Sequence, residues 1–148
     1  MSDIKKFVIV GSGYRGSFAY AEPIVKNFGA CADLCGVYDI NKKRAEHLSK
    51  IVGKHVPVYD SFEKMIDEVR PYSVIVTTKD AHHDEYVIKA LSMGCNVICE
   101  KPMTTTAEKC RAIFEAQRKY KKDVFITFNL RFDPFFSSIK DIVMQDCL

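Results

Sequence analysis

Six short apolar runs alternate with helix-like segments along the chain, and this alternation restricts the fold more than any other feature. The runs are Phe7–Val10, Leu34–Tyr38, Val56–Tyr59, Ser73–Thr77, Asn96–Cys99 and Val124–Phe128. Short apolar runs bounded by turn residues are typical of buried strands. Strands that alternate with helices through short connections form βαβ units around a parallel sheet. We therefore predict an α/β fold, with a Rossmann-like doubly wound parallel sheet in a three-layer α/β/α arrangement.

The segments between these runs carry helix signals. The predicted helices cover Arg44–Val52, Asp84–Met93 and Thr106–Tyr120, and a last one begins near Pro134. Gly53 and Gly94 follow the first two helices, where glycine commonly ends a helix. Ser61 is the predicted N-cap of a further helix. In the longest helix, the spacing puts Ile113 and Phe114 on one apolar face.

Length and composition indicate one globular domain. The chain has 148 residues, of which 47% are hydrophobic and 28% are charged, as in an ordinary soluble domain. The net charge of +3 is too small to indicate nucleic acid or an anionic membrane as a partner. No run approaches the ~20 apolar residues that span a bilayer, and the N-terminus lacks the features of a signal peptide.

The cysteines indicate a reducing compartment and no metal site. They are Cys31, Cys35, Cys95, Cys99, Cys110 and Cys147. No two of them form a Cys-x-x-Cys pair, and no histidine cluster accompanies them with zinc spacing. We expect most of them to be small buried apolar residues of a cytoplasmic protein.

A glycine-rich loop directly follows the first run, and its sequence is Gly11-Ser12-Gly13-Tyr14-Arg15-Gly16. This is G-x-G-x-x-G between a strand and a helix, the context in which the motif binds dinucleotides. Gly11 permits the tight turn, Gly13 lets the backbone approach a pyrophosphate, and Gly16 lets the helix pack on the strand. The phosphates would lie at the helix N-terminus, with Arg15 as a nearby cation. A glycine turn without any ligand is the alternative.

Asp39 ends the second run, where an acid in such folds hydrogen-bonds the adenosine ribose. A carboxylate there accepts from a 2′-hydroxyl and repels a 2′-phosphate, which favours NAD over NADP. Lys42, Lys43 and Arg44 could pair with a phosphate, so NADP stays open. Two other interpretations also stay open: Asp39 as the N-cap of the next helix, and a site for S-adenosylmethionine, which uses a similar loop and acid.

The tripeptide Glu100-Lys101-Pro102 follows the fifth run. In an open α/β sheet, ligands bind at the carboxyl ends of the strands. A carboxylate and an amine therefore arrive together where chemistry is expected. A charged pair followed by proline is also an ordinary way for a chain to leave a strand.

These features resemble the Gfo/Idh/MocA oxidoreductases, in the same order along nearly the whole chain. The matching segments are Gly11–Gly16, Asp39 in Tyr-Asp-Ile-Asn, Val74–His83, Gly94–Pro102 and Asn129–Pro134. Gly-x-x-Val-x-x-Glu-Lys-Pro and the last segment are the most specific. The resemblance implies an oxidoreductase that uses NAD, or NADP, to transfer a hydride to or from a sugar, polyol or related hydroxyl compound.

The resemblance also implies roles for single residues. Lys101 would lie beside the nicotinamide and the substrate hydroxyl as the catalytic, proton-relaying residue. Glu100 would hydrogen-bond the nicotinamide ribose, and similar enzymes often have a cis bond before the residue that is Pro102 here. The remaining residues expected at the cofactor are Gly11, Ser12, Gly13, Tyr14, Arg15, Gly16, Asp39, Thr77, Thr78 and His83. Lys79 departs from the family, where many relatives have proline, and this leaves the contacts of Thr78 open.

Relatives of this kind have a second, mostly antiparallel α/β domain. It supplies much of the substrate pocket, further catalytic groups including a histidine, and the usual oligomer interface. By this resemblance, residues 1–148 form the dinucleotide-binding domain of a longer homo-oligomeric enzyme, stop inside a helix at Gln145–Leu148, and are inactive alone. A naturally short protein is the alternative.

Two other functions stay open. Similar scaffolds occur in NAD-dependent glycosidases, and a dinucleotide-binding sensor would need the glycine loop without any catalysis. Lys101 favours an enzyme, because a sensor needs no proton relay.

Phenylalanines crowd the C-terminal part of the chain, at Phe125, Phe128, Phe132, Phe135 and Phe136. We expect some of them in the core, because successive residues of a strand face opposite sides. The later ones would lack a partner surface, and exposed apolar patches promote association. A concentration-dependent dimer or an aggregating monomer is therefore expected.

Overall fold

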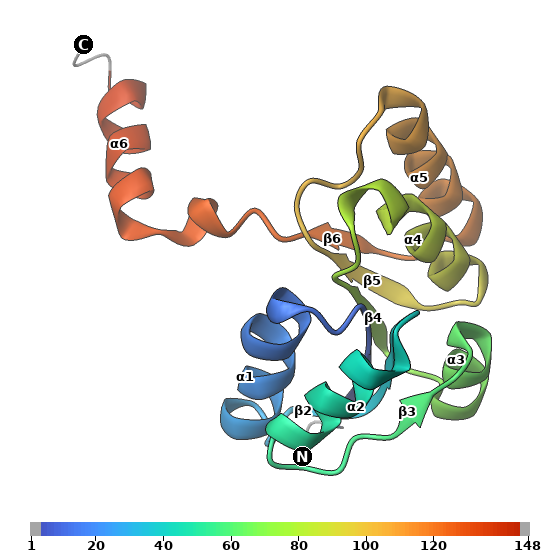
Figure 1. Ribbon diagram of the computed structural model, residues 1–148. Coiled ribbons are helices and arrows are strands. Elements are labelled where there is room, and N and C mark those ends of the chain that lie inside the picture. The colour runs from blue at the N-terminus through green and yellow to red at the C-terminus, as the bar shows by residue number, and fades with distance from the viewer. Residues whose placement is uncertain (1–3, 146–148) are drawn as a thin grey trace.

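Each of the six apolar runs forms a strand in the computed structural model, which describes residues 4–145 (Figure 1). The strands are β1 (Lys5–Val10), β2 (Ala32–Tyr38), β3 (Val58–Tyr59), β4 (Ser73–Val76), β5 (Asn96–Cys99) and β6 (Val124–Ile126). They pair in parallel in the order β3-β2-β1-β4-β5-β6. The strand order reverses between β1 and β4, as in doubly wound dinucleotide-binding sheets. The predicted Rossmann-like fold is confirmed.

Helices connect the strands and cover the sheet. They are η1 (Arg15–Ala21), α1 (Glu22–Asn27), α2 (Lys42–Ile51), α3 (Phe62–Val69), η2 (Asp80–His82), α4 (His83–Ser92), α5 (Ala107–Tyr120), η3 (Asn129–Phe132) and α6 (Pro134–Met144). η1 is a π-helix and α1 continues it, so the helix after the glycine loop begins with a wider turn than expected. The Ser61 hydroxyl accepts from the Lys64 N–H at 3.2 Å, which confirms the predicted N-cap of α3.

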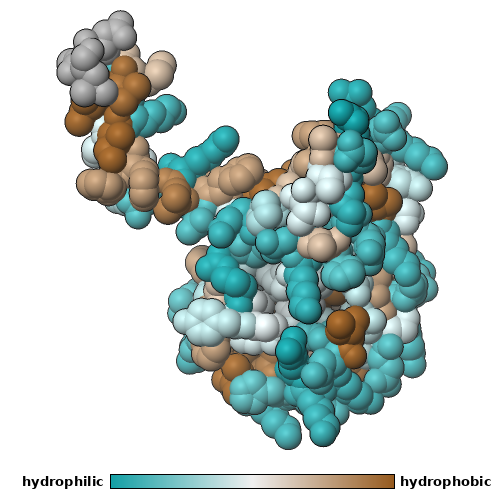
Figure 2. Space-filling view, turned by 45° about the horizontal axis from the view of Figure 1, so that its top comes forward, coloured by the Kyte–Doolittle hydropathy of each residue, from teal (hydrophilic) through white to brown (hydrophobic). Residues whose placement is uncertain are grey.

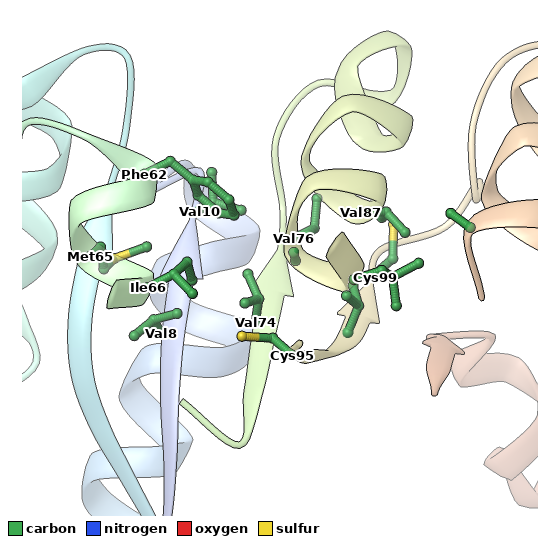
Figure 3. Close-up of a cluster of buried hydrophobic side chains, with 14 of the residues drawn as sticks. Val8, Val10, Phe62, Met65, Ile66, Val74, Val76, Val87, Cys95 and Cys99 are labelled. Carbon is green, nitrogen blue, oxygen red and sulfur yellow. The ribbon is translucent and has the colours of Figure 1, made fainter. Parts of the chain in front are cut away.

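The core forms two apolar layers, one on each face of the sheet. One layer packs Val8, Val74 and Val97 against α3, α4 and α5, and Figure 3 shows part of it. The other packs Ile9 and Ile75 against residues of η1 and α2. Each such side chain contributes about 1.5–3 kcal/mol when fully buried. The expected three layers are therefore present.

Three local expectations are corrected by the structure. The side chain of Asn41 accepts from the Lys43 N–H, so α2 begins before Arg44. Pro57 has no N–H to donate to a ladder, and β3 begins after it. Phe114 is exposed, because Ala116 shares the buried face of α5 with Ile113.

Beyond β6 the chain leaves the compact body, and α6 lies apart from it (Figure 1). The five phenylalanines named above are all exposed, so the expectation that some are core is wrong. Val124 and Ile126 face the core instead, and Phe125 between them points to the other side of the sheet. α6 ends at Met144, and residues 146–148 of the predicted helix end lie outside the described range.

The expectation that most of the cysteines are buried is wrong, since only two of the five described ones are. Cys95 and Cys99 are buried, Cys35 and Cys110 are half-buried, and Cys31 is exposed. These five are free thiols, and Cys147 lies outside the described residues. Within residues 4–145, no helix combines the length and the apolar character needed to cross a bilayer.

Candidate functional site

The carboxyl ends of β1, β2 and β4 meet at one edge of the sheet, and a cavity of about 390 Å³ lies there. Five of the residues predicted at the cofactor line it: Gly11, Gly13, Asp39, Thr77 and Thr78. They come from three neighbouring strand ends, which only the parallel sheet brings together.

The three glycines of the loop differ in what a side chain at each position would meet. Gly11 has a φ of +92°, and a Cβ there would lie 2.7 Å from the backbone of Thr77. A Cβ on Gly16 would lie 2.2 Å from the carbonyl oxygen of Gly11, so the helix packs directly on the loop. A Cβ on Gly13 would meet no atom within 4 Å. Gly13 borders the cavity. Its missing side chain therefore leaves space in the cavity and is not needed for packing within the fold.

Asp39 is tied to the glycine loop. Its Oδ2 accepts from the N–H and the hydroxyl of Ser12, at 2.7 and 2.8 Å. Its Oδ1 accepts from the N–H of Asn41 at 2.8 Å. Asn41 is the N-cap of α2, so the interpretation of Asp39 as that cap is wrong. The carboxylate lies between the loop and the start of α2 and borders the cavity.

The two threonines after β4 differ in their contacts. The hydroxyl of Thr77 is buried and donates to the carbonyl oxygen of Gly11 at 2.5 Å, which holds the tight turn. Thr78 is less buried, and its carbonyl oxygen lies 3.1 Å from Nε2 of His83. Both line the cavity together with Lys79.

His83 is buried, with only 1% of its surface exposed, and does not line the cavity. Its Nδ1 lies 2.9 Å from the carbonyl oxygen of Pro102, and its Nε2 faces Thr78. The ring therefore bridges the segments after β4 and β5. A contact of His83 with a cofactor stays a prediction.

Glu100 is the centre of a polar cluster. Its Oε1 accepts from Nη2 of Arg15 at 2.5 Å and from the Tyr20 hydroxyl at 2.7 Å. The Tyr20 oxygen also lies 3.1 Å from the hydroxyl of Thr127, after β6. Burial acts to raise the pKa of the Glu100 carboxyl, but the hydrogen bonds from Tyr20 and Arg15 outweigh it and lower the pKa below its usual value. Glu100 is therefore an anion at neutral pH.

Lys101 and Pro102 follow the buried Glu100 and are exposed. The peptide bond between them is cis, as expected from the resemblance. The N–H of Lys101 donates to Oε2 of Glu100 at 3.2 Å. Tyr14 is also exposed, and its ring contacts that of Phe18 at a centroid distance of 4.8 Å.

Several residues at this edge were not predicted from the sequence. They are Val10, Ile40, Lys79, His82, Glu85 and Tyr86, whereas Arg44, which also lines the cavity, was expected as a possible partner of a phosphate. Ile40 could have been found from its closeness to Asp39 in the sequence. Tyr86 and Tyr20 carry no such signal, because only the packing of helices on the sheet brings them near the site.

The residues present fit a dinucleotide. An acid after β2, a loop without a side chain at Gly13 after β1 and a buried anion after β5 follow one another along the edge. In this order they could accept from one ribose, make room for a diphosphate and accept from a second ribose. An anion at the loop would also be favoured by the N-terminal N–H groups of the helix.

Comparison with protein families gives one match over most of the chain. Residues 5–128 match the model of the Gfo/Idh/MocA oxidoreductase family, NAD-binding Rossmann fold. Among curated proteins, the inositol 2-dehydrogenase of Agrobacterium fabrum is 31% identical over 136 residues, which cover 91% of this chain and 40% of that protein.

Solved structures show the same fold. An oxidoreductase from Thermotoga maritima is 29% identical, with a TM-score of 0.86 over 97% of this chain and 44% of that one. The WlbA dehydrogenase from Chromobacterium violaceum, in complex with NADH and UDP-GlcNAcA, is 24% identical, with a TM-score of 0.88 over 98% of this chain and 41% of that one. The chain thus spans about two fifths of the length of these relatives.

Proposed function

Because the chain belongs to the Gfo/Idh/MocA oxidoreductase family, NAD-binding Rossmann fold, we propose that it is the cofactor-binding part of a hydride-transferring enzyme. The substrate would be a sugar, polyol or related hydroxyl compound, as the inositol 2-dehydrogenase among its relatives suggests. The observation that carries the proposal is the alignment of Asp39, Gly13 and Glu100-Lys101 along one sheet edge.

The binding roles follow from the contacts of each group. Asp39 would accept from the adenosine ribose, and the loop Gly11–Gly16, with Ser12, Tyr14 and Arg15, would face the diphosphate. The middle of the dinucleotide would lie against Thr77, Thr78 and His83. The nicotinamide ribose would lie against Glu100 and Pro102. Glu100 is suited to this role, because its carboxylate is charged and held in place by Tyr20.

Lys101 is the proposed catalytic residue. When bound, the nicotinamide supplies the hydride donor or acceptor. The Lys101 amine would take the proton from the substrate hydroxyl, or return it, because the hydroxyl must lose its proton as the hydride leaves. The backbone N–H of Lys101 donates to the Glu100 carboxylate, and the carbonyl oxygen of Pro102 lies at hydrogen-bond distance from the His83 ring. These contacts hold the backbone that carries Lys101. In the full-length parent, Lys101→Ala should keep NAD binding and abolish turnover, and unchanged turnover would disprove the assignment.

NAD is the proposed cofactor, and NADP is the alternative. Asp39 would repel a 2′-phosphate, whereas Arg44 at the same cavity would attract one. Lys42 pairs with Asp60 at 2.7 Å, and an exposed pair of this kind can still give way to a phosphate. Calorimetric titration of the chain with NAD, NADP and S-adenosylmethionine tests the proposal. Failure of both dinucleotides to bind would refute it.

A substitution at Asp39 separates the two dinucleotides. Asp39→Ala should lower the affinity for NAD about tenfold, which is the cost of one hydrogen bond to a charged group. The difference between the affinities for NAD and NADP should therefore become smaller. Asp33→Ala is the matched control, because Asp33 lies near the start of β2, pairs with Lys54 and does not line the cavity. An unchanged NAD to NADP ratio in Asp39→Ala would contradict the ribose role.

The remaining proposals concern the whole protein. A further domain outside residues 1–148 would supply the substrate pocket and the interface of a homo-oligomer. A cytoplasmic location is supported by the five free cysteines among the described residues, since thiols persist in reducing compartments.

A further inference from the structure

An ion pair joins the glycine loop to the Glu-Lys-Pro segment. Nη2 and Nε of Arg15 both donate to Oε1 of Glu100, at 2.5 and 3.2 Å. These two donors form one edge of the guanidinium. Such an edge can hold a carboxylate or a phosphate through two parallel hydrogen bonds. Glu100 therefore occupies a part of Arg15 that a phosphate would also use.

The two partners are held very differently. The Glu100 side chain is only 6% exposed and also accepts from Tyr20 and from the Lys101 N–H. The Arg15 side chain is 48% exposed, and within residues 4–145 no second carboxylate pairs with it. A long, half-exposed side chain can change partner at low cost, whereas a buried carboxylate with further donors stays in place. Arg15 is therefore the movable partner.

The pair lies beside the cavity on the β5 side. The cavity extends from Asp39 after β2, past Gly13, to Thr77 and Thr78 after β4. Glu100 follows β5, the next strand, and its N–H donates to the carbonyl oxygen of Val76 at 3.0 Å. Arg15 is two residues beyond Gly13. With the ribose at Asp39 and the diphosphate at the loop, as the proposed function has it, the phosphates lie beside Arg15.

We propose that Glu100 and a bound diphosphate compete for the guanidinium of Arg15. The diphosphate carries more charge than the carboxylate and draws Arg15 away from Glu100. The Oε1 atom that Arg15 leaves is then available to a ligand hydroxyl beyond the diphosphate. Glu100 thus lowers the affinity for nucleoside diphosphates that lack such a hydroxyl. A complete dinucleotide regains this affinity, because its further hydroxyl binds the Oε1 atom that Arg15 has left.

The test uses ADP and adenosine as probes, titrated calorimetrically into the full chain. Glu100→Gln removes the competing charge and should raise ADP affinity about fivefold, the effect of a partly exposed ion pair. Arg15→Gln should lower ADP affinity. In the Arg15→Gln background, Glu100→Gln should have little effect, because no guanidinium remains to be released. Adenosine affinity should stay within about twofold throughout, since adenosine has no phosphate.

Other outcomes overturn the proposal in distinguishable ways. If Glu100→Gln lowers ADP affinity, Glu100 positions Arg15 for the phosphate rather than competing. If it raises ADP affinity equally with and without Arg15, the effect is general charge repulsion. If ADP binds no tighter than adenosine, the phosphates do not reach Arg15, although the adenosine site stands.

Two further results complete the test. Binding of neither ADP nor adenosine would refute the proposed function and the competition together. Thermal unfolding of each variant shows whether it folds. Should Glu100→Gln not fold, Glu100→Asp shortens the side chain by one methylene, withdraws the carboxylate from Arg15 and should raise ADP affinity in the same direction.

Discussion

Nδ1 of His83 lies 2.9 Å from the carbonyl oxygen of Pro102, although the two residues belong to different βα connections of the sheet. His83 begins α4, and Pro102 follows β5 at the cis peptide bond. The other ring nitrogen faces the carbonyl oxygen of Thr78. One buried ring thus joins the wall of the cavity to the backbone that carries Lys101.

We expect His83→Leu to lower the free energy of unfolding by about 1 kcal/mol, because one of the two part-buried hydrogen-bond partners, the carbonyl oxygens of Thr78 and Pro102, loses the N–H of the ring. His82→Leu is the matched control: His82 is exposed and pairs with Glu85 on the surface, and its loss should cost less than about 0.5 kcal/mol. Urea denaturation of both variants measures the difference. Equal effects of the two substitutions would show that the His83 bridge contributes nothing.

Substitutions at Gly13 and Gly16 of the loop should separate binding from folding. Gly13→Ala should fold normally, since its Cβ meets no atom within 4 Å, and should weaken NAD at least about tenfold by filling the space in front of the loop. Gly16→Ala should lower the free energy of unfolding by about 1–3 kcal/mol or more, since its Cβ would press on the Gly11 carbonyl. Calorimetry and thermal unfolding test the pair. Unchanged NAD affinity in Gly13→Ala would argue against a phosphate at this loop.

The sequence predicted the parts of the site whose residues directly follow an apolar run along the chain. The glycine loop and Asp39 each follow an apolar run directly, so their positions at a strand end could be read from neighbouring residues. Tyr20 could not be found in this way, because it reaches Glu100 and Thr127 only after three segments have packed together. Phe114 was predicted on the wrong face of α5, because the buried face is the one that Ile113 shares with Ala116. Phe125 is exposed, because periodicity does not show whether another element covers a given face.

Tyr20 should contribute to a loss of stability in alkali. Burial, the largest cause, raises the pKa of Tyr20 from 10.0 to about 12. Below pH 10 its contribution is present in full, because both folded and unfolded states keep the proton. Between pH 10 and about 12 only the unfolded state ionises, so the free energy of unfolding falls. Burial likewise raises the pKa of Tyr86 and of Cys99 to about 12, so these groups add to the same slope.

Tyr20→Phe should therefore reduce the alkaline slope without abolishing it. At pH 8 the variant should be less stable than the wild type by about 1 kcal/mol, because the hydrogen bond to Glu100 is lost. Urea unfolding at pH 8, 10 and 11.5 gives both quantities. A slope above pH 10 identical to that of the wild type would mean that Tyr20 is not protected from ionisation by the fold.

The apolar face of α6 should make the chain self-associate. Phe135, Ile139 and Ile142 follow helical spacing and are all exposed, and Figure 2 shows apolar residues gathered along this arm. An exposed stripe of this kind favours contact with a second copy. Sedimentation velocity should show a larger species as concentration rises, and the double substitution Phe135→Lys with Ile139→Lys should shift the chain toward monomer. Phe114→Lys is the control, since Phe114 is an exposed phenylalanine on α5 and away from this face. A wild-type monomer at the highest concentration, or an equal shift with Phe114→Lys, would show that α6 is not the contact.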